Sequence, residues 1–111
     1  MKKDVIVKLT KSFEEVALVE EEVEYWMARD LQRLFEYASW ENFANVIEKA
    51  KIACQNSNHL KDNHFRDVMK MIDLGKGSRK EISDCKLSRY ACYLIAQNGD
   101  PRKESIAFAQ S

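Results

Sequence analysis

The stretch Lys86-Leu-Ser-Arg-Tyr-Ala-Cys-Tyr-Leu-Ile-Ala-Gln-Asn-Gly-Asp-Pro-Arg-Lys103 decides how the C-terminal part of this chain folds. Its apolar residues recur at the spacing of one helix face: Leu87, Tyr90, Ala91, Leu94 and Ile95. Asn98-Gly99 supplies a left-handed residue that closes a helix, and Asp100-Pro101 supplies an N-cap and a first-turn proline. The stretch therefore predicts a helix over residues 87–97, a stop, and a second helix from residue 101.

Composition limits the kind of protein. The chain has 111 residues, of which 45% are hydrophobic and 32% charged, with one proline and three glycines. This is the size of a single domain, residues 1–111, and such a composition is typical of a folded, helix-rich chain. The longest apolar runs are far below the ~18 residues that a membrane span requires. We therefore expect a cytoplasmic protein with no membrane partner.

The cysteines indicate neither a disulfide framework nor a metal site. Cys54, Cys85 and Cys92 are odd in number and unevenly spaced, and the N-terminus lacks a secretion signal, so reduced thiols are expected. Closely paired ligands such as Cys-x2-Cys are absent from the sequence. We accordingly expect no metal and no cofactor.

In the N-terminal half, apolar spacing predicts helices over residues 4–15 and 28–37 and a third helix that Ser39 caps. The last two have the length of a helix-turn-helix pair, although most such units serve only packing. Residues 13–26 are ambiguous. Ser12-Phe-Glu-Glu15 suits a helix capping box, whereas apolar residues alternate like strands around a turn at residues 20–22. The residue pattern of this segment is compatible with either a helix or a hairpin.

Further along, His64, Phe65, Val68 and Met69 predict a short helical turn. Residues 71–74 predict a strand, residues 75–80 a loop, and residues 81–85 the returning strand, because two glycines permit a tight reversal. Three of the six loop residues are cationic, namely Lys76, Arg79 and Lys80. This basic hairpin is the main functional candidate of the sequence.

The net charge of zero conceals an asymmetry. Residues 1–59 carry 8 basic and 11 acidic side chains, a net of −3, and residues 60–111 carry 10 basic and 7 acidic, a net of +3. Positive charge gathered on one face would suit a polyanion, mainly through phosphate contacts. The alternative is that the loop over residues 75–80 is only a solvent-exposed turn that binds nothing. The candidate nucleic-acid-binding residues are Lys70, Lys76, Arg79, Lys80, Arg89, Arg102 and Lys103.

Catalytic motifs are missing from the sequence. Gly75-Lys-Gly-Ser78 lacks the order of a phosphate-binding P-loop, and the cysteines have no evident partner histidine. Asp62 and His64 could support acid–base chemistry, but such a pair more often caps a turn. We therefore expect no enzymatic activity.

Five segments together resemble the N-terminal domain of the bacterial DNA-damage-inducible protein D family, which is similar to the Bro-N domains of phage antirepressors and viral proteins. They are residues 25–32, 37–43, 46–54, 62–65 and 87–103. The resemblance implies a hairpin, not a helix, before residue 28. It also implies a bacterial protein of the SOS response whose N-terminal domain binds DNA. Glu36 and Asn58 stand where the family usually has glycine, and Cys85 where a tyrosine is common.

These observations predict an α+β fold, a mostly helical small domain with one or two short β-hairpins. It would bind DNA with weak sequence preference, through the basic hairpin and adjoining helix starts. The alternative is a protein–protein interaction module that acts on DNA-repair or repressor proteins through acidic residues, and self-association as a homodimer is a third reading. We expect the chain to be the N-terminal fragment of a longer protein. The acidic residues are Glu14, Glu15, Glu20, Glu21, Glu22 and Glu24.

Overall fold

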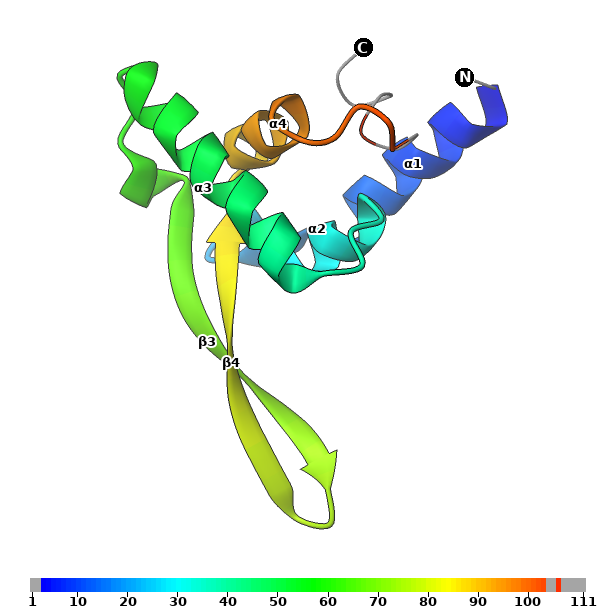
Figure 1. The fold of residues 1–111 in the computed structure, drawn as a ribbon, viewed down its shortest axis with the longest axis vertical. Helices are drawn as coiled ribbons and strands as arrows, with labels where there is room; N and C mark the ends of the chain where they lie inside the picture. The colour runs from blue at the N-terminus through cyan, green and yellow to red at the C-terminus, as the bar shows by residue number, and fades with distance from the viewer. Residues whose placement is uncertain (1–2, 104–105, 107–111) are drawn as a thin grey trace.

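The computed structural model describes residues 3–103 and 106, and it consists of a helical body from which a long β-arm projects (Figure 1). The β3–β4 hairpin forms the arm, and the helices gather around its root. In chain order the elements are α1 (Lys3–Glu15), β1 (Leu18–Glu20), β2 (Val23–Met27), α2 (Ala28–Leu34), α3 (Trp40–Asn56), a 3-10 turn η1 (Lys61–Asn63), β3 (Phe65–Gly75), β4 (Ser78–Leu87) and α4 (Arg89–Gln97).

The four strands form one antiparallel sheet in the order β1-β2-β4-β3. Two cross-strand pairs, Trp26 with Leu87 and Met27 with Lys86, join the N-terminal hairpin to the arm. The fold is α+β, but the expectation of a mostly helical domain with one or two short hairpins is wrong. Strands β3 and β4 are 11 and 10 residues long, and both hairpins belong to a single sheet.

The helical turn expected at residues 64–69 is also wrong, because β3 already begins at Phe65. Apolar residues at 65, 68, 69 and 72 fit a helical spacing as well as the two faces of a strand. The loop expected over residues 75–80 is a two-residue turn, in which Lys76 and Gly77 have φ of 52° and 76°. Arg79 and Lys80 consequently lie in β4.

The N-terminal hairpin is confirmed. Leu18 pairs with Tyr25, and Glu20 pairs with Val23. The two residues between the strands, Glu21 and Glu22, have φ of 50° and 68°. Positive φ at both central residues is the geometry of a type I′ turn, whose twist suits a tight hairpin.

Two turns in the body keep a backbone conformation that glycine adopts most easily. Glu36 follows α2 with φ of 62°, and Asn58 follows α3 with φ of 64°. These are the two positions at which the resembling family usually has glycine. The helix expected over residues 28–37 ends at Leu34, two residues before Glu36. Glu36 and Asn58 therefore adopt a positive φ without being glycine.

The core lies where the sheet root meets α2, α3 and α4. Trp26, Leu31, Phe43, Leu87 and Ile95 are fully buried. The expected Ser39 cap is confirmed, since Ser39 Oγ accepts the amide of Asn42 in α3. Ser88, which the sequence analysis did not single out, caps α4 in the same way by accepting the amide of Ala91.

The remaining expectations concern the thiols and the ends of the chain. Cys54, Cys85 and Cys92 are free and buried. Pro101 to Lys103 form a turn and bend, and Ile106 is helical and buried. The other residues of the helix expected from Pro101 lie outside the described part of the chain. Within that part, no helix is long and apolar enough to cross a membrane.

Asp84 joins the arm to the body. Its side chain is 3% exposed, and Oδ1 accepts the amides of Arg29, at 3.1 Å, and Cys85, at 2.8 Å. Met27, the N-cap residue of α2, makes no side-chain capping bond, so Asp84 satisfies a first-turn amide of this helix from β4. The Arg29 side chain adds a second link, because Nε donates to the Ser83 carbonyl and the guanidinium lies 4.0 Å from the Trp40 ring centroid.

We predict that Asp84→Ala lowers the free energy of unfolding by about 1–3 kcal/mol, because two poorly hydrated amides lose their acceptor. Urea unfolding followed by circular dichroism measures the change. Glu81→Ala, an exposed carboxylate on the same strand, is the matched control and should change stability by less than about 0.5 kcal/mol. Equal losses in both variants would contradict the role of Asp84.

Candidate nucleic-acid interface

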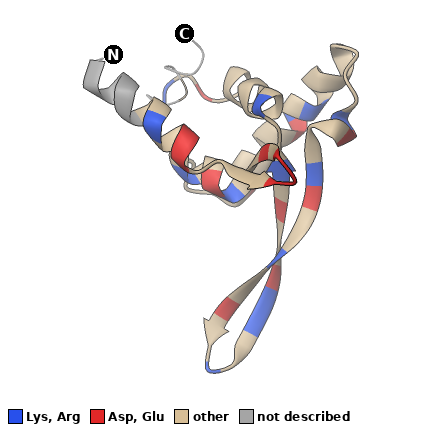
Figure 2. Ribbon diagram, turned by 180° about the vertical axis from the view of Figure 1, so that it is seen from behind, with Lys and Arg blue, Asp and Glu red and all other residues tan. Residues whose placement is uncertain are grey.

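Four of the seven predicted binding residues lie on the arm. Lys70 is in β3, Lys76 in the turn, and Arg79 and Lys80 in β4. In Figure 2 basic positions follow the arm from its root to its tip. Of the residues that the structure describes, none forms an ion pair with these four side chains. Their charges are therefore available to a ligand.

The register of the ladder divides the arm into two faces. Directly paired residues share a face and successive residues alternate, so β3–β4 pairing assigns each side chain to one side. The first, which we call the basic face, carries Arg66, Val68, Lys70, Ile72, Lys80, Ile82, Asp84 and Lys86. The second, which we call the methionine face, carries Asp67, Met69, Met71, Asp73, Arg79, Glu81 and Ser83.

The two faces of the arm differ in the number of exposed carboxylates that they carry. Asp84 is the single carboxylate of the basic face along β3 and β4, and it is buried with its Oδ1 bound to backbone amides. The methionine face exposes Asp67, Asp73 and Glu81. Arg79 stands directly across from Asp73 on that face. An approaching polyanion would therefore meet cations on the basic face and a mixture of charges on the methionine face.

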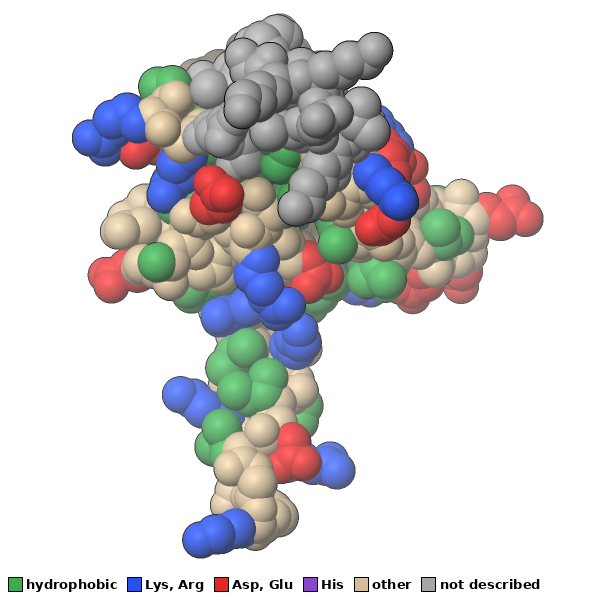
Figure 3. Space-filling view, turned by 90° about the vertical axis from the view of Figure 1, so that its right-hand side faces the viewer, with side chains coloured by type: hydrophobic (Ala, Val, Ile, Leu, Met, Phe, Trp, Pro, Cys, Tyr) green, Lys and Arg blue, Asp and Glu red, His purple; other side chains and the backbone are tan. Residues whose placement is uncertain are grey.

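Lys70 and Lys80 are close neighbours on the basic face. Lys70 pairs with Ile82 and Ile72 pairs with Lys80, which makes the two lysines diagonal neighbours, roughly 7–8 Å apart. Arg66 lies four residues nearer the root on the same face, about 13 Å from Lys70 along the strand. Aliphatic side chains fill the spaces between these cations. The space-filling view shows basic and hydrophobic side chains, together with acidic ones, along the projecting arm (Figure 3).

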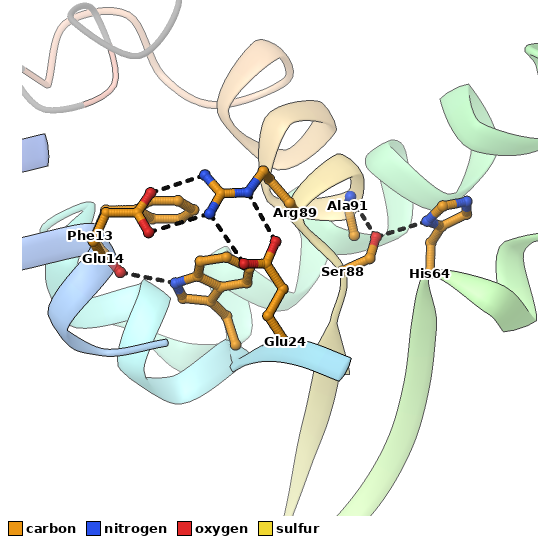
Figure 4. Close-up of polar contacts among 8 residues, drawn as sticks. Phe13, Glu14, Glu24, His64, Ser88, Arg89 and Ala91 are labelled. Atoms are coloured by element: carbon orange, nitrogen blue, oxygen red, sulfur yellow. Dashed lines mark hydrogen bonds and ion pairs between the residues drawn. The ribbon is translucent and has the colours of Figure 1, made fainter. Parts of the chain in front are cut away.

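Arg89 is not part of this surface, because two carboxylates bind its guanidinium (Figure 4). Nη1 and Nη2 donate to Glu14 at 2.8 and 3.1 Å, and Nε and Nη2 donate to Glu24 at 2.9 and 3.1 Å. The guanidinium also lies 5.0 Å from the Trp26 ring centroid. These hydrogen bonds raise the pKa of Arg89 and lower the pKa of both glutamates. Arg89 thus ties α1 and β2 to α4.

The two cations after Pro101 also have internal partners. Arg102 donates to both carboxylate oxygens of Asp100, and this contact lowers the pKa of Asp100 to about 2. Lys103 Nζ donates to the Glu36 carbonyl at 2.9 Å and lies 4.8 Å from the Tyr37 ring centroid. The structure does not bring Arg89, Arg102 and Lys103 together with the arm cations.

Arg66 is the residue that sequence reasoning missed. It is exposed, lies on the basic face, and has no ion-pair partner among the described residues. Apolar residues at 68, 69, 71, 72 and 74 follow no period of two, so the sequence carries no alternation signal that could have found it. Lys86, directly across the ladder, is less available because Nζ contacts Glu20 Oε2 at 2.8 Å.

The other chemical candidates form structural contacts. His64 Nδ1 lies 2.7 Å from Ser88 Oγ, and burial lowers the pKa of this histidine. Trp26 is buried, Trp40 and Tyr90 are half-buried, and Tyr93 is 56% exposed. The described residues contain no group of three or more His, Cys, Asp or Glu side chains that could hold a metal ion.

Comparison with known proteins gives two matches. The family model described as "BRO family, N-terminal domain" matches residues 15–110. DNA damage-inducible protein D of Escherichia coli (strain K12) is 43% identical over 100 residues, which make up 89% of this chain and 36% of that protein. The chain thus spans about a third of the length of this relative. No solved structure matches the chain.

The Arg89 contacts predict a pH dependence of stability. Because Arg89 lowers the folded-state pKa of Glu14 and Glu24, its stabilisation is present above the ordinary carboxyl pKa and disappears as pH falls through the lowered values. Arg89→Gln should therefore lower Tm at pH 6 and have a smaller effect at pH 3. Thermal unfolding at several pH values measures this, with Lys11→Gln, in an exposed pair with Glu15, as control. An Arg89→Gln curve parallel to that of the unaltered chain would contradict the assignment.

Proposed function

Because this chain belongs to the BRO N-terminal domain family, we propose that it is the DNA-binding domain of a protein of the DNA-damage response. The resemblance to the DNA-damage-inducible protein D family, predicted from the sequence, is confirmed by the match to the Escherichia coli protein. The name of that relative supports a role in the response to DNA damage. We further propose a non-enzymatic, cytoplasmic protein of the bacterial SOS response.

The basic face of the arm is the observation that supports DNA binding most directly. Arg66, Lys70 and Lys80 share it, with no exposed carboxylate between them, and Lys76 extends the charge to the tip. Each neutralised phosphate of duplex DNA contributes about −0.9 to the slope of log K against log salt. Four contacts therefore correspond to a slope of about −3.6, which means moderate affinity that salt screens easily.

The arm suits duplex DNA better than a single strand. Residues 66–86 contain no aromatic side chain, so the arm offers no ring on which unpaired bases could stack. Duplex DNA also has the denser phosphate charge, one per roughly 1.7 Å of helix axis. Lysine and arginine contacts to phosphates carry little sequence information. We therefore propose binding to duplex DNA with weak sequence preference.

The alternative of an interaction module with a basic partner finds less support. Four of the six acidic residues that suggested it already have cationic partners. Arg89 binds Glu14 and Glu24, Lys86 binds Glu20, and Lys11 lies 3.8 Å from Glu15. Glu21 and Glu22, at the tip of the β1–β2 hairpin, have no ion-pair partner among the described residues. These two carboxylates alone offer little negative surface to which a DNA-repair or repressor protein could bind.

The first functional prediction concerns the combined change Lys70→Gln, Lys76→Gln and Lys80→Gln. Removing three phosphate contacts should weaken binding to a labelled duplex and reduce the salt slope from about −3.6 to about −0.9. Fluorescence anisotropy between about 50 and 200 mM salt measures both. The matched control replaces Lys11, Arg33 and Lys49, exposed cations of the body, by glutamine. Equal losses in the two triple variants would reject the arm as the binding surface.

A second prediction compares two adjacent cations of β4 that point to opposite faces. Lys80→Gln should weaken duplex binding several-fold, because Lys80 lies on the basic face beside Lys70. Arg79→Gln should have a smaller effect, because Arg79 lies across from Asp73 on the methionine face. The same anisotropy titration at low salt compares the two. A larger loss for Arg79→Gln would show that the methionine face contacts DNA instead.

A further inference from the structure

The outer edge of β3 is open. Strand order places β3 at the edge of the sheet, and beyond the root the arm projects away from the helices (Figure 1). Along such an edge, backbone amides and carbonyls that point outward have no partner strand. A two-stranded hairpin without other support is marginally stable in water. The arm therefore has backbone groups that can pair with another strand, and such pairing would stabilise the hairpin.

The side chains of this edge do not block pairing. Exposed edge strands are commonly protected by proline, by several charges or by a bulge. Between Val68 and Leu74 the strand has two charged residues of opposite sign, Lys70 and Asp73, and no proline, and its register is irregular only between Asp73 and Gly75. Met69, Met71 and Leu74 are 61%, 52% and 58% exposed. Large apolar side chains on an open edge indicate a protein partner.

We propose that a second copy of this chain pairs with the β3 edge, antiparallel, about a twofold axis through Met71. Beyond its root, β3 runs from residue 68, which lies beside α3, to residue 74, and Met71 is the midpoint of this stretch, so the register pairs the whole stretch with itself. Met71 then faces Met71 of the second copy. On each side of the axis, Lys70 faces Ile72, Met69 faces Asp73, and Val68 faces Leu74.

Charge and apolar contacts favour this register over its neighbours. It places no like charges directly opposite each other, and it brings the Met69 and Met71 side chains of both copies into one cluster. A shift of two residues toward the root would set Lys70 against Lys70 and Asp67 against Asp73. A shift of two residues toward the tip would pair Met69 with Gly75 and shorten the ladder.

The twofold axis is perpendicular to the sheet, because residues that pair directly share a face. The basic faces of the two copies therefore lie on the same side of a combined four-stranded surface. Two equal cationic strips would meet a duplex together, although the pairing itself needs no DNA. The inference is independent of the proposed function, since one concerns the mass of the free chain and the other concerns its affinity for DNA.

Light scattering on the 111-residue chain tests the pairing. The unaltered chain should have twice the mass of one copy. Met71→Lys, which sets two ammonium groups against each other at the axis, should have the mass of one copy with an unchanged circular dichroism spectrum. Leu60→Lys, at an exposed apolar residue outside the arm, is the control and should keep the dimer mass. A single-copy mass for the unaltered chain at every concentration would overturn the proposal.

Cysteine cross-linking tests the register. Met71→Cys should form a disulfide-linked dimer rapidly under mild oxidation, because paired residues have Cβ atoms roughly 4.5–5.5 Å apart. Met69→Cys, an equally exposed position on the same face, should cross-link much more slowly, since its equivalent in the second copy is about 13 Å away along the strand. Cross-linking of Met69→Cys at the same rate as Met71→Cys would overturn the register.

Discussion

The β3–β4 ladder holds the body and the arm together, because the same two strands form core at one end and an exposed hairpin at the other. At the root, Phe65 pairs with Leu87 and Leu87 pairs with Trp26, and all three side chains are buried. A free two-stranded hairpin is only marginally stable in water. Burial of its root, together with the Asp84 contact to α2, gives the arm a fixed direction relative to the body.

Tertiary structure divides the cations of the chain into two groups. Arg89 and Arg102 are bound by carboxylates and stabilise the body. Lys86, at the root of the arm, pairs with Glu20, whereas the cations farther out, Lys70, Lys76, Arg79 and Lys80, form no ion pair with any described residue. A neutral chain can therefore present a local cationic face, because its negative charge is used elsewhere in the fold.

Local patterns predicted α1 to α4, the Ser39 cap and the presence of a C-terminal hairpin. They missed the length of β3, since apolar residues at 65, 68, 69 and 72 have helical spacing, whereas in the strand they are divided between its two faces. They could not show that Arg89 meets Glu14, which is 75 positions away, or that Asp84 meets Arg29, 55 positions away. Contacts at such separations depend on the complete fold. The assignment of Lys80 and Arg79 to opposite faces likewise needed the register of the ladder.

The most direct test of the account is a nuclear magnetic resonance titration of the labelled chain with duplex DNA at low salt. Backbone amide signals of residues 66–86 should shift progressively, with the largest changes at Arg66, Lys70 and Lys80, while those of α1 and the β1–β2 hairpin stay in place. Shifts confined to the body, with the arm signals unchanged at saturating DNA, would contradict the claim that the basic face of the arm is the DNA-binding surface.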